Sequence, residues 1–123
     1  SNFTITWLNE QVCSLLDKYA AQVPGSDPLR NPLALDEPIE KELVLQLLQF
    51  PAAVVRAAEA YKPSVLADYL FGLSQTYSSF YQRSPVLKAE PAVRDSRIRL
   101  CAMVAQVLAE GLGLLGIATP RRI

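Results

Sequence analysis

Apolar residues recur every three or four positions along most of this chain, a spacing that places them on one face of an α-helix. The first such stripe consists of Ile5, Leu8, Val12, Leu15, Leu16, Tyr19 and Val23. Shorter runs follow at 39–50 and 52–62, and a longer one at 64–83. The stripe of the longer run consists of Leu66, Tyr69, Leu70, Leu73, Tyr77 and Phe80. The pattern therefore predicts four helices before the last quarter of the chain.

Prolines separate these helices. Residues 24–37 form a proline-rich stretch that predicts an irregular connection. Two carboxylates precede Pro38, and carboxylates with an early proline are typical of the first turn of a helix. Pro51 and Pro63 open the next two helices in the same way.

A last helix is predicted from Ala92 onward. It could either span a membrane or be buried in the core of the bundle. Between Leu100 and Ala118 the only charge is Glu110, and a membrane span needs about 20 apolar residues. However, Gln106 and Glu110 lie on one side of this helix, opposite the apolar stripe. The other helices also have apolar faces that need a central partner. We therefore expect a buried core helix, with Leu108 in its stripe, and no membrane segment.

Residues 1–123 are expected to form one domain, an all-α bundle of about five helices. Its parts would be a first helix within 1–23, the connection at 24–37 and the main bundle at 38–123. No run alternates with the period of a β-strand.

The composition excludes most kinds of catalytic and metal-binding site. The chain has no histidine, so it cannot form a Ser-His or Cys-His catalytic arrangement. Its two cysteines lie far apart, and a glycine-rich phosphate loop is absent. We therefore expect no catalytic residue, no metal site and no cofactor in this chain, and reduced thiols in a cytoplasmic protein. Twelve basic residues balance twelve acidic ones, so nucleic-acid binding would need a local patch.

Four phrases occur in a familiar order, and together they cover about two thirds of the chain: "KPSVLADYLFGLSQTYSSFY", "SPVLKAE", "VRDSRIRLCAMVAQVLAEGLGLLGI" and the terminal "PRRI". This succession resembles the DALR anticodon-binding domain, the α-helical C-terminal domain of arginyl-tRNA synthetases. The resemblance implies that the chain binds the anticodon loop of arginine-acceptor tRNA. It also implies that ATP and arginine belong to a catalytic domain that is absent here.

The resemblance also suggests which residues contact tRNA. Splayed loop bases stack on aromatic side chains and are hydrogen-bonded at their edges, while cations hold the phosphates. The candidate residues are Trp7, Gln11, Tyr81, Arg121, Arg122 and Ile123. Trp7 stands where the family usually has tyrosine, Gln11 where it has arginine, and Ile123 where it ends on methionine. The sequence Asp-Ala-Leu-Arg that names the family corresponds here to residues 91–94, Pro-Ala-Val-Arg.

Other positions are expected to act structurally. Arg97 falls in phase with the apolar stripe of the last helix, so it should form a partly buried ion pair with Asp68 or Glu59. Gly111 should allow a neighbouring backbone to approach, and Gly116 should end the helix. The tail after it is expected to fold back near the first helix.

Two alternatives stay open. The chain could be a diverged DALR relative without synthetase activity that binds RNA or protein, or a helical protein-interaction module unrelated to tRNA. In each case we expect a monomer without catalytic activity of its own, although the parent protein of a true synthetase domain would be an arginine–tRNA ligase.

Overall fold

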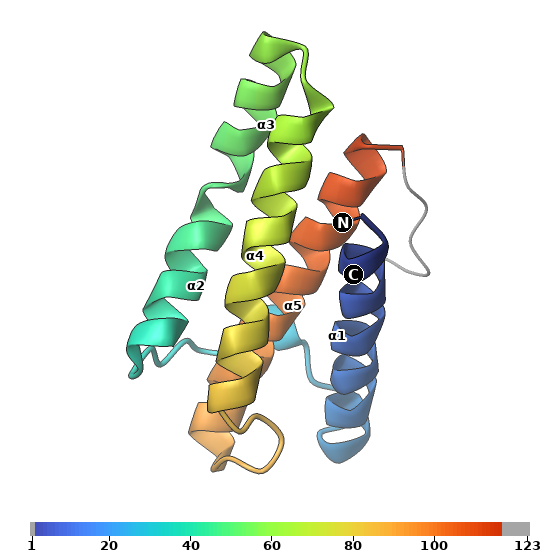
Figure 1. The fold of residues 1–123 in the computed structure, drawn as a ribbon. Coiled ribbons are helices and arrows are strands. Elements are labelled where there is room, and N and C mark those ends of the chain that lie inside the picture. Colours follow the sequence, from blue (N-terminus) through green and yellow to red (C-terminus); the bar gives the residue numbers. More distant parts are fainter. Residues whose placement is uncertain (1, 117–123) are drawn as a thin grey trace.

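The computed structural model describes residues 2–116, which fold into five α-helices and one short 3-10 turn (Figure 1). The elements are α1 (Asn2–Gln22), η1 (Pro28–Arg30), α2 (Pro38–Leu48), α3 (Phe50–Ala60), α4 (Pro63–Arg83) and α5 (Pro91–Leu114). The described residues contain no β-strand. The predicted all-α fold is confirmed.

The helices begin and end at the residues that suit each role. Proline occupies the first turn of α2, α3, α4 and α5, where its missing N–H costs no hydrogen bond. Gly116 follows α5 with φ +80°, and its N–H donates to the Gly113 carbonyl at 3.0 Å. Its positive φ is a conformation that glycine adopts without strain, so Gly116 ends α5 as predicted.

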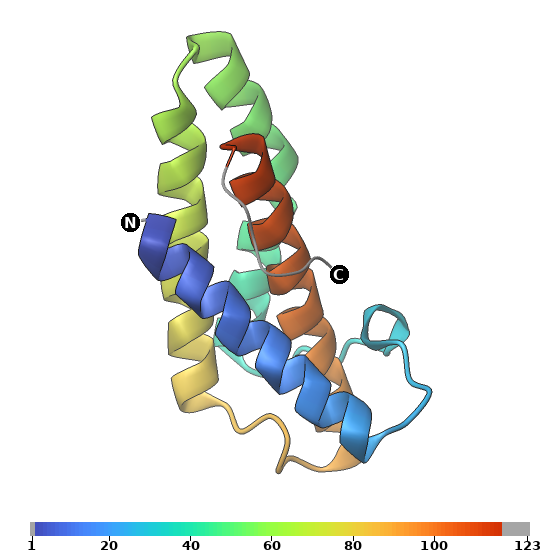
Figure 2. The ribbon, with the colours of Figure 1, turned by 90° about the vertical axis from the view of Figure 1, so that its right-hand side faces the viewer.

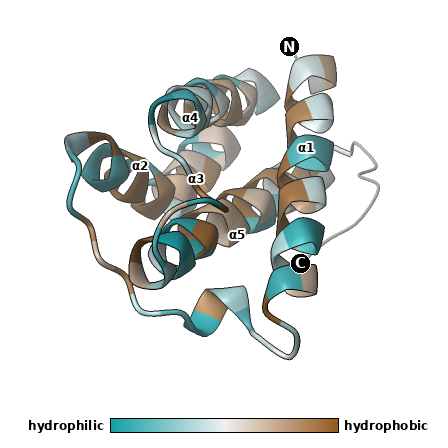
Figure 3. Ribbon diagram, turned by 90° about the horizontal axis from the view of Figure 1, so that it is seen from below, coloured by the Kyte–Doolittle hydropathy of each residue, from teal (hydrophilic) through white to brown (hydrophobic). Residues whose placement is uncertain are grey.

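Helix α5 lies at the centre of the bundle, between α1, α2 and α4 (Figure 3). Leu108 has no exposed surface, and the expectation of a buried last helix is confirmed. Gly111 permits a close approach, although the neighbour is a side chain rather than a backbone. A Cβ at Gly111 would lie only 2.6 Å from a methyl carbon of Leu70 on α4.

Among the described helices, no single one is long and apolar enough to cross a membrane. Helices α2 and α3 would meet that test only as a pair bent by 40°, by length and composition alone.

Arg97 forms a buried ion pair, but its partner differs from the predicted ones. Its Nε lies 3.4 Å from Oε2 of Glu40 on α2, and the Glu40 side chain is only 1% exposed. Asp68 and Glu59 were the wrong choices because both are exposed side chains. Arg97 stands near the start of α5, where α2 begins, whereas Glu59 lies at the far end of α3 (Figure 1).

Polar contacts fix the connection between α1 and α2. The Asn31 side-chain amide donates to the Tyr19 hydroxyl at 3.2 Å and to the Asp95 carbonyl at 3.0 Å. The Ala34 N–H donates to Oγ of Ser96 at 2.8 Å. These bonds tie the connection to both α1 and α5, and so help to hold α1 across the bundle (Figure 2).

Candidate nucleic-acid interface

A surface groove of about 250 Å³ runs between α1 and α4. Figure 2 shows α1 crossing the bundle at an angle, with its N-terminal end beside α4. The α1 side chains that the site uses are Trp7, Gln11, Ser14 and Lys18. The corresponding α4 side chains are Tyr77, Ser78, Tyr81 and Gln82.

Helical spacing explains why these residues share the groove. The four α1 positions are separated by steps of four, three and four residues, so they project from one face of the helix. The α4 positions form two adjacent pairs, 77–78 and 81–82, one turn apart. Each helix therefore presents one continuous strip of side chains to the groove.

Two aromatic rings reach solvent here. Trp7 is 54% exposed and Tyr81 is 51% exposed, although aromatic side chains of this size are usually more buried. Both line the groove, so flat π surfaces are available to a ligand. Such surfaces suit unstacked nucleobases.

Tyr81 is supported from beneath by the buried Tyr77. The two ring centroids are 6.1 Å apart with an interplanar angle of 22°. The Tyr77 hydroxyl donates to Sγ of Cys101 on α5 at 3.7 Å, which anchors its ring in the core. Burial raises the pKa of the Cys101 thiol to about 12 and raises the pKa of the Tyr77 phenol as well. Both groups are therefore neutral at physiological pH, so neither places a charge beneath the Tyr81 ring.

Polar side chains line the rest of the groove. Gln11 and Gln82 carry amides, which both donate and accept hydrogen bonds, and Ser14 and Ser78 carry hydroxyls. These groups can meet the edges of a base whose face lies on an aromatic ring. The sequence reasoning missed Ser14, Ser78 and Gln82, together with Lys18. The available signal on α1 was the helical step of three residues from Gln11 to Ser14 and of four from Ser14 to Lys18. On α4, Ser78 and Gln82 directly follow Tyr77 and Tyr81.

The structure brings Trp7, Gln11 and Tyr81 into the same groove, as the sequence-based hypothesis required. Arg121, Arg122 and Ile123, with the predicted tail, lie outside the described residues. Within residues 2–116, no group of three or more Cys, Asp or Glu side chains could hold a metal ion.

Comparison with known proteins gives consistent results. The family model named DALR anticodon binding domain matches residues 10–123. An arginine–tRNA ligase from Thermobifida fusca is 42% identical in an alignment of 102 residues that covers 80% of this chain and 18% of that protein. One from a Synechococcus strain (CC9605) is 47% identical over 91 residues, which are 74% of this chain and 15% of that protein.

A solved structure gives the same result. The arginyl-tRNA synthetase of Thermus thermophilus superimposes with a TM-score of 0.80 at 33% identity, covering 98% of this chain and 21% of that one. The chain thus spans less than a quarter of each of these relatives.

Proposed function

Because this chain belongs to the DALR anticodon-binding domain family, and matches the C-terminal region of arginyl-tRNA synthetases, we propose that it binds the anticodon loop of an arginine-acceptor tRNA. The observation that carries this proposal is the convergence of Trp7, Gln11 and Tyr81 on one groove. Three side chains from two helices, far apart in sequence, combine stacking surfaces with an amide.

The groove suits recognition rather than catalysis. A loop base that leaves its own stack can lie on Trp7 or Tyr81, and the side-chain amide of Gln11 can hydrogen-bond its edge. Such binding would hold the tRNA in place while chemistry proceeds elsewhere. We assign ATP, arginine and the ligase reaction of protein biosynthesis to a catalytic domain in the parent protein, which would work in the cytoplasm. This chain itself, as a single domain and a monomer, needs no cofactor for binding.

Replacing Trp7 with alanine should weaken tRNA binding by about 1–3 kcal/mol, the usual value of one base–aromatic stack. The variant should remain folded, because the ring is half exposed. Affinity is measured by fluorescence anisotropy of a labelled arginine-acceptor tRNA. Trp7 is the only tryptophan in the chain, so its emission in the wild-type protein should also change as the RNA enters the groove.

The matched control is Tyr61→Ala. Tyr61 is 92% exposed at the far end of α3, so it tests the loss of a surface aromatic outside the groove. It should bind tRNA as the wild type does. If Trp7→Ala also binds with wild-type affinity, the groove is not the binding site.

A further inference from the structure

A second hollow continues the groove beyond Tyr81. It measures about 320 Å³ and is lined by Leu15, Tyr81 and residues 84–88 of the loop that joins α4 to α5. Leu15 and Tyr81 line both hollows, so the two are adjacent. We refer to the two hollows together as the track. The track therefore offers space beyond the groove at Trp7.

The loop that forms the outer wall of the second hollow is held in place by the core. Ser84 and Val86 are each only 4% exposed. The Arg97 guanidinium, which also pairs with Glu40, donates from Nη1 to the Pro85 carbonyl at 2.7 Å. The wall is thus fixed to α5, and the hollow exists before any ligand arrives.

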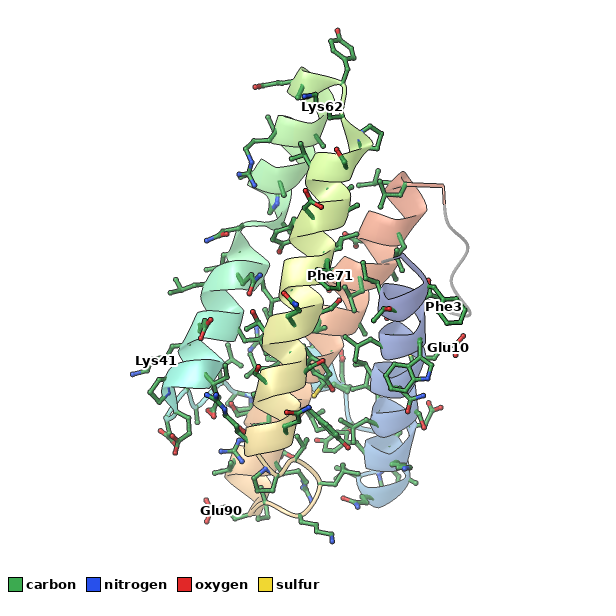
Figure 4. The ribbon with its side chains drawn as sticks, in the orientation of Figure 1. Phe3, Glu10, Lys41, Lys62, Phe71 and Glu90 are labelled. Carbon is green, nitrogen blue, oxygen red and sulfur yellow. The ribbon has the colours of Figure 1, made fainter. Side chains whose placement is uncertain are left out.

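The charged side chains that line the track are both cations. Among the described residues, Lys18 lines the first hollow and Lys88 the second, and no carboxylate lines either one. Glu10 is adjacent to Gln11 in sequence and Glu90 ends the loop; both are labelled in Figure 4. Neither residue lines the first or the second hollow. This local excess of positive charge occurs in a chain whose formal net charge is zero.

Both lysines are available to a ligand. Each is exposed, and neither forms an ion pair within the described part of the chain. A lysine ammonium acts as a point charge that suits a phosphate group. Cationic side chains beside exposed aromatic rings are the usual features of a surface that binds single-stranded nucleic acid.

We propose that the second hollow receives the nucleotide next to the base held at Trp7, and that Lys18 and Lys88 contact the phosphates of this stretch of the anticodon loop. This inference rests on the proposed function and extends it from one base to a strand that passes Tyr81. Phosphate contacts carry no base information. The two lysines therefore set affinity and the position of the strand, while the groove at Trp7 and Gln11 distinguishes bases.

The test uses Lys18→Gln and Lys88→Gln, which remove the charge and leave a shorter, uncharged polar side chain. The affinity of each variant for an arginine-acceptor tRNA and for the same tRNA with a substituted anticodon is measured across a salt series. Each variant should reduce the slope of log affinity against log salt by about 0.7, the value for one single-strand phosphate contact. Both RNAs should lose affinity by the same factor, leaving their ratio unchanged.

Lys41→Gln is the matched control, since Lys41 is an exposed lysine on α2, across the molecule from α1 (Figure 4). It should keep the wild-type slope. Suppose that Lys18→Gln and Lys88→Gln keep the wild-type slope while Trp7→Ala still binds tRNA more weakly. That result would overturn the proposal for the second hollow and leave the proposed function standing. If the wild-type chain binds neither RNA, or Trp7→Ala has no effect, both proposals fail together.

Discussion

Replacing Arg97 with methionine should lower the free energy of unfolding by about 3–5 kcal/mol, the usual result of removing one partner of a buried ion pair. The loss leaves the Glu40 carboxylate, 1% exposed, without its cation inside the bundle. It also removes the hydrogen bond from Arg97 to the Pro85 carbonyl. Urea denaturation followed by circular dichroism measures the change.

The double variant Glu40→Leu with Arg97→Met is the control. Because it removes both charges, it should be more stable than Arg97→Met alone. This comparison separates the cost of an unpaired carboxylate from the loss of packing. A single variant within half a kcal/mol of the wild type would show that the pair is not buried in solution.

Replacing Leu108 with alanine should cost about 2–5 kcal/mol, because the side chain is fully buried in the central helix and its removal leaves a cavity. Leu114→Ala provides a comparison on the same helix, where the side chain is 62% exposed. That substitution should change the free energy of unfolding by no more than about 0.5 kcal/mol. Equal effects at the two positions would contradict the central placement of α5.

The helices were predictable because their signals are local. Apolar spacing of three and four residues, and the prolines at 38, 51 and 63, depend only on neighbouring positions. The central place of α5 also followed, since its stripe is long and the other helices need a partner. The ion-pair partner of Arg97 could not be predicted from the sequence, because it depends on which turn of α2 packs against α5.

Asn9 shows a second limit of pattern reading. It was left out of the apolar stripe because it is polar, yet it has no exposed surface and its amide has no hydrogen-bond partner in the described structure. A buried amide of this kind costs free energy, and hydrophobic periodicity does not anticipate it.

The candidate site was predictable in part. Trp7, Gln11 and Tyr81 came from family resemblance, and their meeting in one groove depends on how α1 crosses α4. Lys18 had a local signal, because it continues the steps from Gln11 and Ser14 along one helix face. Lys88 had none. It reaches the track only because contacts with α5 fix the loop at 84–88.

The most direct test of anticodon recognition is the affinity of the wild-type chain for two RNAs at one salt concentration. One is an arginine-acceptor tRNA, and the other is the same tRNA with a substituted anticodon. We predict that the first binds more tightly by about 1–3 kcal/mol, the usual discrimination from one bidentate contact between a side chain and a base. Equal affinity for the two RNAs would contradict anticodon recognition by this chain.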